Sequence, residues 1–355
     1  MSSEEMNAAL YDGRGGLRRQ TVPMPKLVPG GALLRVKACG IAISDLRAYK
    51  AGASLQRAYK TTMVPRLLHK LAGEIAQVAP EVTGIEVGDR VYITGYYHCG
   101  ECSSCRRGFT NLCEKRTWFY DERIALSEYV VLPPKSLQTG GATKVGKHVS
   151  FGDATHVGPL SNCLNTLRAV DFAPGDSAVV LGAGPMGLLH VLLLRAFGAS
   201  KIIVLDVDEF RLEKSKEFGA DYVINARTVD AVAEVKRLAD GGADVVIVAT
   251  GRPDAMLSSL NMVRSRGRID FFGGIALEPG DATFKLDPNP VHYKELKIVG
   301  SYGSLPDDYR VAAELMTSGR ISPSRLDTHH FDFEHLEDAL LAEKDPRALR
   351  VLIEL

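Results

Sequence analysis

Four of the six cysteines lie within fifteen residues, in the stretch HCGECSSCRRGFTNLC. They are Cys99, Cys102, Cys105 and Cys113, a C-x2-C-x2-C-x7-C spacing. Four thiolates complete a tetrahedral zinc site and leave no open position for a substrate, so the pattern predicts one structural Zn²⁺ per chain. An iron–sulfur cluster, disulfides and empty thiols are the alternatives. In the bacterial ferredoxin pattern the last gap is about three residues and a proline follows, whereas here Glu114 follows a gap of seven.

A glycine-rich turn follows the apolar run at 177–181 and opens a helix-like stretch. It reads Gly182-Ala183-Gly184-Pro185-Met186-Gly187, the GxGxxG pattern. Gly182 permits the tight turn, Gly184 lets a pyrophosphate approach the backbone, and Gly187 lets helix and strand pack closely. The helix begins at Pro185 and Met186. Its N-terminus adds N–H donors and the positive end of the helix dipole. The motif therefore predicts a dinucleotide site.

An acidic residue, Asp206, ends the next strand-like run and indicates which dinucleotide binds. It lies at about the expected 20 residues beyond the glycine turn, where a carboxylate accepts hydrogen bonds from the adenosine ribose. Because this carboxylate repels a 2′-phosphate, we expect NAD(H) rather than NADP(H). Arg211 is the opposing signal, because a nearby arginine can hold that phosphate.

Short apolar runs alternate with helix-like stretches from Ser177 to about Ser301. The runs span 177–181, 201–205, 222–224, 244–248, 268–272 and 296–300. This alternation predicts a parallel sheet covered on both faces, in a doubly wound Rossmann arrangement. The first 150 residues read instead as short strands broken by glycine, proline and aspartate, and the last fifty residues are mixed. The predicted fold class is α/β, with a mainly β second domain.

Composition excludes several classes of protein. The 355 residues include 43 Lys+Arg and 43 Asp+Glu, so no basic footprint for nucleic acid exists. The N-terminus lacks the basic and apolar segments of an export signal, and no apolar run reaches the roughly 18 residues of a membrane span. We expect a cytoplasmic protein with no membrane partner, in which clustered cysteines bind metal.

Several motifs together resemble one known family. They are VPMPKLVPGGALLRVKACGI, GDRV, the cysteine lobe, SEYVVLP, GAGPMG, Asp206 with Arg211, ATG and ALRVLIEL. With them the chain resembles the zinc-containing medium-chain dehydrogenase/reductase family, particularly its polyol, sorbitol and threonine dehydrogenase branch. The resemblance implies a small-molecule substrate and a homodimer or homotetramer. It also implies that Arg350 approaches the cofactor pyrophosphate.

The resemblance further implies the domain organisation. A GroES-like catalytic domain spans 1–158 and carries the zinc lobe at about 95–115. A Rossmann dinucleotide-binding domain spans 159–299, and residues 300–355 return to the catalytic domain.

In active relatives a second, catalytic zinc is held by three segments, and each is altered here. Ala42 stands where the first ligand, a thiolate, is expected, and Gly158 stands where the third ligand is expected. His69 is retained, but Lys70 follows it in place of an acid. Because a catalytic zinc needs about three protein ligands, these segments do not support one. His156 could rebuild the site with His69; the alternative is an ordinary hydrogen-bonded histidine.

The four residues that we expect to carry catalysis are Ser44, Asp45, His69 and Lys70. Ser44 matches the hydroxyl that relays the substrate proton in relatives, or else caps a turn. Asp45 matches a carboxylate that orients His69, so the two form either an acid/base pair or a purely structural pair. Lys70 either stabilises a developing alkoxide in place of the metal or forms a salt bridge.

Other residues near these segments have two readings. Arg47 replaces a relay histidine and does not release a proton near neutral pH. A group of aromatic residues flanks the cysteine lobe and lines either the substrate cleft or a packed core: Tyr96, Tyr97, Trp118, Phe119 and Tyr120.

The expected function is NAD(H)-dependent hydride transfer to or from a secondary alcohol or ketone of a polyol, cyclitol or sugar-like substrate, without a catalytic zinc. Two alternatives remain open. One is a zinc-independent reaction on an unsaturated carbonyl, or a transient oxidation within an epimerisation or elimination. The other is a non-catalytic NAD-binding sensor.

Overall fold

The structure, a computed structural model, describes residues 4–12, 16–51, 67–119, 123–275 and 285–355. The chain divides into two compact units. The first comprises residues 1–158 and 305–355, and the second comprises residues 159–304. The C-terminal segment thus returns to the unit that holds the N-terminus, and the return begins at Leu305 rather than at the expected residue 300.

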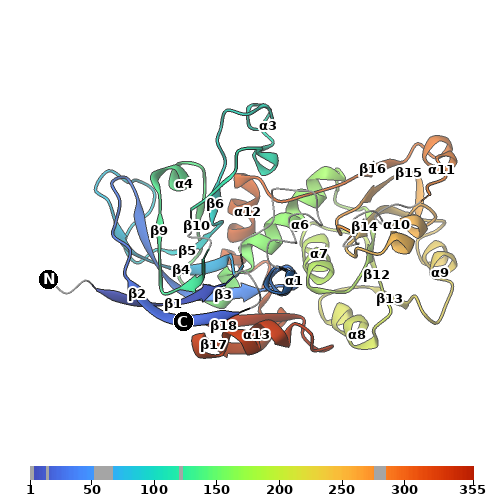
Figure 1. The fold of residues 1–355 in the computed structure, drawn as a ribbon. Coiled ribbons are helices and arrows are strands. Elements are labelled where there is room, and N and C mark those ends of the chain that lie inside the picture. The colour runs from blue at the N-terminus through green and yellow to red at the C-terminus, as the bar shows by residue number, and fades with distance from the viewer. Residues whose placement is uncertain (1–3, 13–15, 52–66, 120–122, 276–284) are drawn as a thin grey trace. The chain divides into compact units, whose positions relative to one another are not determined.

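A six-stranded parallel sheet forms the centre of the second unit (Figure 1). Its strand order is β13-β12-β11-β14-β15-β16, which is the doubly wound order. The strands are β11 (Ser177–Leu181), β12 (Lys201–Asp206), β13 (Tyr222–Asn225), β14 (Ala243–Val248), β15 (Val263–Asp270) and β16 (Lys297–Val299). All six residues of β14 are buried, as expected for a strand covered on both faces. The predicted Rossmann fold is confirmed.

Helix α6 (Val157–Ala169) precedes the first of these strands, and among the described residues five further helices connect them. They are α7 (Pro185–Ala196), α8 (Glu209–Glu217), α9 (Ala231–Leu238), α10 (Pro253–Ser259) and α11 (Asn289–Tyr293), of which α8 and α9 have side-chain caps. The side chain of Asp208 accepts a hydrogen bond from the Arg211 N–H at the start of α8, and Asp230 caps α9 in the same way. Strand β15 begins five residues before the predicted 268, with Arg266 at a φ of 59° and a register shift against β14.

The first unit is mainly β, as predicted. A seven-stranded sheet has the order β10-β5-β4-β3-β18-β17, with β9 also paired to β3. Its strands are β3 (Ala32–Ile41), β4 (Lys70–Val78), β5 (Arg90–Ile93), β9 (Tyr129–Leu132), β10 (Ala142–Lys144), β17 (Asp327–Asp332) and β18 (Arg350–Glu354). A three-stranded sheet contains β1 (Glu5–Tyr11), β2 (Leu17–Pro23) and β8 (Ile124–Ser127), and a two-stranded sheet contains β6 (Tyr96–Tyr97) and β7 (Thr117–Trp118).

Short helices complete the first unit. They are α1 (Ile43–Ala51), α3 (Ser103–Arg106), α4 (Pro134–Gln138), α5 (Phe151–Ala154), α12 (Pro306–Thr317) and α13 (Leu336–Ala342), with the 3₁₀ helices η1 (Thr110–Leu112), η2 (Ser324–Leu326) and η3 (Phe333–His335). Among the described residues, no helix is long and apolar enough to cross a membrane.

Strand β3 positions the expected catalytic segments. Its C-terminal end pairs antiparallel with the start of β4, with Gly40 opposite Lys70. On its other side Gly40 lies opposite Leu352 of the C-terminal strand β18. Helix α1 begins directly after β3. The chain therefore brings residues 39–47, 68–70 and 350 together around one strand end.

Candidate active site and zinc lobe

The four cysteines of the lobe form one cluster, with their sulfur atoms all within 4.8 Å of one another. Sγ–Sγ distances are 3.6 Å between Cys99 and Cys113, 3.9 Å between Cys99 and Cys105, and 4.0 Å between Cys102 and Cys113. Zinc–sulfur bonds of about 2.3 Å in a tetrahedron place sulfurs about 3.8 Å apart. The cluster therefore fits one structural zinc ion.

Backbone N–H groups of the lobe point at the thiols. The N–H groups of Glu101 and Cys102 donate to Cys99 Sγ at 3.5 and 3.3 Å, and the Cys99 N–H donates to Cys113 Sγ at 3.3 Å. Backbone hydrogen bonds lower the pKa of Cys102 to about 6, whereas burial raises the pKa of Cys105 to about 12. Donors already aimed at the sulfurs favour thiolates, the form that binds zinc.

A cavity of about 540 Å³ lies at the carboxyl ends of the first strands of the Rossmann sheet. Gly182, Asp206, Arg227 and Thr250 are among its lining residues. Gly182 has a φ of 105°, which favours glycine, and a Cβ at Gly187 would come within 1.9 Å of the Gly182 carbonyl oxygen. The volume falls within the range of about 300–1,000 Å³ of cofactor pockets. Both glycines are thus required by the turn.

Three backbone N–H groups orient Asp206. Its Oδ2 accepts from Ala183 at 2.6 Å, and its Oδ1 accepts from Val207 at 2.7 Å and from Asp208 at 3.1 Å. Arg211 lies close to the same turn, with Nη1 3.8 Å from the Cβ position of Gly184. Both signals of the sequence, the carboxylate and the arginine, therefore lie beside the glycine turn.

The carboxylate of Asp45 is the centre of the expected catalytic group. Asp45 is 1% exposed and accepts hydrogen bonds of 2.9 Å from the backbone N–H groups of Ala42 and Leu68. Its Oδ2 also accepts from Lys70 Nζ at 2.9 Å, and His69 Nδ1 lies 3.5 Å from its Oδ1. By bonding the N–H that precedes α1, Asp45 also completes the first turn of that helix. The buried carboxylate of Asp45 thus connects the start of α1 with residues 68–70 at the start of β4.

Charge pairing sets the ionisation of Asp45. Burial acts to raise its pKa, but the Lys70 ammonium and the His69 imidazole together hold the pKa of Asp45 well below its usual range. Lys70 has a side chain only 12% exposed. Lys70 therefore forms a salt bridge, and its partner is Asp45.

Two other expected residues lie on α1. Ser44 is half-buried in the first turn, next to Asp45, and Arg47 is exposed one turn later. The Asp45–His69 pair has the geometry expected for a carboxylate that orients an imidazole. The assignment of Ser44, His69 and Lys70 to catalysis stays a prediction.

Arg350 and His156 form a separate buried network. Arg350 Nη1 lies 3.1 Å from Asp327 Oδ1, and Nη2 donates to the hydroxyl and carbonyl oxygens of Thr155 at 2.7 and 3.1 Å. The guanidinium packs against Gly40, where a Cβ would come within 1.7 Å of Nη2. His156 is fully buried, with Nε2 3.0 Å from both Asp327 oxygens. The approach of Arg350 to a pyrophosphate stays a prediction.

His156 is not part of a metal-binding group in the described structure. Among described residues, the group of three or more His, Cys, Asp or Glu side chains close enough to bind one ion is the cysteine cluster. Burial and the charge of Arg350 lower the pKa of His156, so the ring is neutral beside Asp327. Asp327, which the sequence analysis did not single out, is its partner.

The charges of Asp45, Lys70 and Arg350 act on the carboxyl group of Glu343. The sequence analysis did not single out Glu343. Its Oε1 is buried and has no hydrogen-bond partner in the described structure. Burial raises the pKa of Glu343 to about 7, the charge of Asp45 adds to this rise, and Lys70 and Arg350 oppose it. The protonated carboxyl is therefore the form that the folded protein favours.

We expect Glu343→Gln to stabilise the protein above pH 7 and to change little near pH 4. Because the folded-state pKa of Glu343 exceeds its ordinary value, stability is lost as pH rises from about 4.5 through about 7. Glutamine carries no charge and avoids that loss. Urea denaturation at pH 4, 6 and 8 measures it, with the exposed Glu81→Gln as control. An equal shift at all three pH values would contradict the expectation.

Aromatic side chains of the lobe reach His69. The rings of His69 and Trp118 meet edge to face with centroids 6.0 Å apart, and Trp118 meets Tyr96 in the same way at 5.2 Å. The Arg116 guanidinium lies over the Tyr96 ring at 4.2 Å from its centroid. Tyr120, expected in this group, lies outside the described residues.

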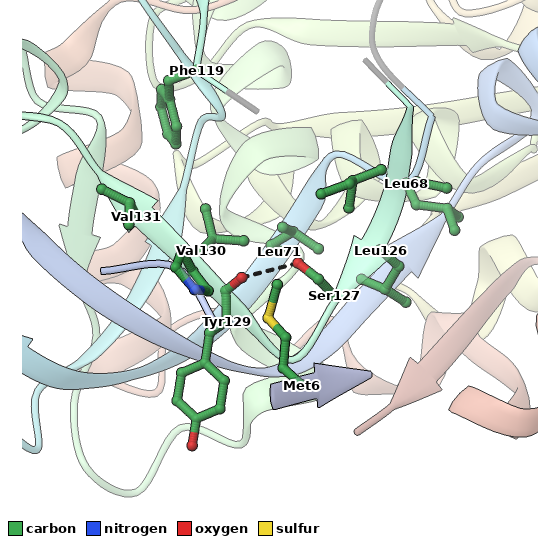
Figure 2. A pocket seen from close by; sticks show the side chains of 12 residues that line it. Met6, Leu68, Leu71, Phe119, Leu126, Ser127, Tyr129, Val130 and Val131 are labelled. Carbon is green, nitrogen blue, oxygen red and sulfur yellow. Dashed lines mark hydrogen bonds between the residues drawn. The ribbon is translucent and has the colours of Figure 1, made fainter. Parts of the chain in front are cut away.

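Leu68 also lines an apolar pocket of about 160 Å³ (Figure 2). Leu71, Phe119, Leu126 and Val130 contribute to its lining. The Ser127 hydroxyl is used in a hydrogen bond of 2.9 Å to the carbonyl of Tyr129, the dashed line in Figure 2. Apart from Ser127 and Tyr129, its lining side chains are apolar, so the lining contains no carboxylate, amine or imidazole.

Comparison with known proteins agrees with this geometry. Residues 28–142 match the family described as alcohol dehydrogenase GroES-like domain, and residues 185–318 match the family described as zinc-binding dehydrogenase. L-threonine 3-dehydrogenase from Pyrococcus horikoshii is 34% identical over 342 residues, which cover 95% of each chain. Probable D-xylulose reductase A from Aspergillus clavatus is 32% identical over 348 residues, covering 93% of this chain and 91% of that protein.

A solved structure shows the same fold over the whole chain. It is a short chain alcohol dehydrogenase from E. coli CFT073 in complex with NADH, with a TM-score of 0.83, 27% identity and coverage of 99% of each chain. Together with the sequence relatives, it confirms the family that the motifs indicated. The chain therefore belongs to the zinc-type medium-chain dehydrogenase family and is an alcohol dehydrogenase-like oxidoreductase.

Proposed function

We propose that the protein transfers hydride between NAD(H) and a secondary alcohol or ketone of a polyol, cyclitol or sugar-like substrate, without a catalytic zinc. The observation that carries the proposal is the buried Asp45, which binds Lys70 at 2.9 Å and orients His69 at 3.5 Å. An ammonium group in this place supplies positive charge while disfavouring a metal cation. Ala42 and Gly158 offer no ligand atom in their side chains.

His69 is the proposed acid/base. Asp45 faces Nδ1 of the ring and orients it, and the imidazole would exchange the proton of the substrate hydroxyl. Lys70 has three N–H donors and uses one on Asp45, so the others can stabilise a developing oxyanion. The half-buried Ser44 hydroxyl would pass a proton between the site and solvent, the role that the family resemblance implies.

The glycine turn and Asp206 would hold the dinucleotide, whose nicotinamide accepts or gives the hydride when bound. Asp206 has three of its roughly four acceptor positions filled by backbone N–H groups. The remaining position can accept a ribose hydroxyl, and its negative charge opposes a 2′-phosphate. This favours NAD(H), although Arg211 lies nearby. We further propose a homodimer or homotetramer, as the family resemblance implies, and light scattering measures the oligomeric state.

Initial rates test the proposal. With NAD⁺ we expect oxidation of at least one of xylitol, sorbitol, myo-inositol and L-threonine, and a kcat/KM for NAD⁺ at least about tenfold above that for NADP⁺, about 1.4 kcal/mol. Asp206→Ser should narrow that ratio because the repelling carboxylate is gone. A higher kcat/KM with NADP⁺ would contradict the cofactor choice.

A different pattern of substrates would favour the alternative reaction. Consumption of NADH with 2-cyclohexen-1-one, and none with D-xylulose or other ketones, would indicate 1,4-reduction and overturn the alcohol dehydrogenase proposal. Turnover that disappears after dialysis against a chelator while one zinc per chain stays bound to the four cysteines, and that returns with added Zn²⁺, would overturn the zinc-free mechanism.

A further inference from the structure

The hydroxyl of Tyr92 occupies the space in which a side chain at Gly158 would begin. Tyr92 lies on β5 and is only 4% exposed. A Cβ built on Gly158 would lie 2.1 Å from Tyr92 Oη and 2.7 Å from its Cζ. These distances leave no room for a side chain. Position 158 is where the resemblance places the third metal ligand, so a phenol hydroxyl stands where that side chain is missing.

The Tyr92 hydroxyl has no hydrogen-bond partner among the residues that the structure describes, although its ring is well packed. The ring stacks on Tyr309 with centroids 6.0 Å apart and planes at 20°. By contrast, the Tyr309 hydroxyl lies 3.2 Å from the Tyr96 hydroxyl. Tyr92 Oη is not one of the fully buried side-chain atoms that lack a partner, so solvent reaches it although the ring is buried. Phenylalanine would pack in the same way, and the hydroxyl adds a donor that the oxygen of a ligand can meet.

A continuous chain of ring contacts connects Tyr92 with His69. Tyr92 stacks on Tyr309, Tyr309 meets Tyr96 through their hydroxyls, and Tyr96 and Trp118 lead to the edge of His69. All five side chains belong to the first unit. Tyr92 also lies opposite Ala72 of the neighbouring strand β4, three residues after His69 in the chain.

Electrostatics favour a donor rather than a base at this position. Burial raises the pKa of Tyr92, and the nearby Tyr96 adds to the rise, while Arg350 opposes it. The phenol therefore keeps its proton near neutral pH. A neutral phenol O–H donates one hydrogen bond and is not consumed by the reaction.

We propose that the Tyr92 hydroxyl donates a hydrogen bond to the oxygen of the reacting carbon of the substrate. This inference rests on the proposed function. During ketone reduction the hydride goes from the dinucleotide to the carbonyl carbon and the proton goes from His69 to the oxygen. Tyr92 retains its own proton and stabilises the oxygen while its charge develops. The hydroxyl thereby shares with Lys70 the polarising role that a metal ion fills when three ligands are present.

Tyr92→Phe is the first test, with xylitol, sorbitol, myo-inositol and L-threonine as the probes. Removing one donor to a developing oxyanion lowers kcat by about 10²–10³-fold, so we expect about a 100-fold loss of kcat on any substrate that the wild type oxidises. The Kd for NAD⁺ and the melting temperature should stay unchanged, because the ring and its stack remain. A merely structural role would instead lower the melting temperature and leave kcat alone.

Two further variants keep the test decisive. Tyr309→Phe makes the same chemical change on the stacked neighbour, whose hydroxyl already faces Tyr96, and should leave kcat within about twofold. Gly158→Ala keeps every hydroxyl but pushes Tyr92 Oη out of place, because the new Cβ requires the space 2.1 Å away. It should lower kcat at least about tenfold. If Tyr92→Phe does not fold, the kcat of Gly158→Ala decides whether the Tyr92 hydroxyl acts as a donor.

The possible results separate this inference from the proposed function. A wild type that oxidises none of the probes overturns the proposed function and the donor role with it. A wild type that is active, with Tyr92→Phe and Gly158→Ala equally fast, overturns only the role of the hydroxyl. An equal loss of kcat in Tyr309→Phe also overturns the donor role of Tyr92, because the loss is then explained by altered packing of the stacked rings.

Discussion

Replacing Asp45 by asparagine is expected to cost about 3–5 kcal/mol of unfolding free energy and to abolish most turnover. The carboxylate is 1% exposed and is the counter-charge of Lys70, whose side chain is 12% exposed. Asparagine keeps the shape but leaves the ammonium without a negative partner. Removing one member of a buried ion pair is far more costly than removing an exposed pair.

A double-mutant cycle isolates the pair. Lys70→Met in the Asp45→Asn background should restore part of the stability, with a coupling of about 0.5–3 kcal/mol, because no unpaired charge remains. Asp254→Asn is the matched control, since Asp254 and its partner Arg252 are both exposed, and it should change stability far less. Additive losses for Asp45 and Lys70 in urea denaturation would contradict the pairing.

The single tryptophan supplies a second measurement on the same variant. Trp118 meets the His69 ring at 6.0 Å, so its fluorescence should report protonation of that imidazole. Asp45→Asn removes a negative charge 3.5 Å from Nδ1 and should move the fluorescence midpoint to lower pH. An unchanged midpoint would separate Asp45 from the acid/base role of His69.

The Rossmann sheet was readable from the sequence because its strands are buried on both faces. Continuous apolar runs gave β11 at its observed bounds and β12, β13 and β14 to within one residue at an end. The start of β15 was wrong because its first five residues, VRSRG, carry arginines whose side chains are exposed. Burial, the signal used for the other strands, is absent there.

The candidate site was only partly readable. The family resemblance implied that Asp45 orients His69 and showed which ligand side chains are missing at 42 and 158. The partner of Lys70 was not foreseen, because it depends on the register that sets Gly40 opposite Lys70 across two register shifts.

What replaces a missing side chain was also not readable from sequence. Glycines 40 and 158 signal a close approach, but whether a backbone, a guanidinium or a phenol fills the space is decided by distant segments. Arg350 fills the space at Gly40 from the last strand, and Tyr92 fills the space at Gly158 from β5. Gly158, a residue without a side chain at an expected ligand position, was therefore the available signal for Tyr92.

Elemental analysis of the purified protein should give about one zinc per chain after loosely bound metal is removed, and Cys113→Ser should bring this close to zero. Sulfur distances of 3.6–4.0 Å already match a tetrahedral site, so the ion needs little rearrangement. Zinc binding contributes about 10–16 kcal/mol of folding free energy in small zinc peptides, so the lobe should open without it.

Limited trypsin digestion detects that opening, because Arg106 and Arg107 lie within the lobe between Cys105 and Cys113. Cleavage there should be fast in Cys113→Ser and slow in the wild type. Cys163→Ser is the control: Cys163 is buried outside the lobe, so the zinc content should stay at one. Two tightly held zinc ions per chain would reveal a second metal site and overturn the zinc-free mechanism, whereas none would overturn the structural site. One zinc, lost only with a lobe cysteine, leaves hydride transfer to depend on the charges and hydrogen bonds around Asp45.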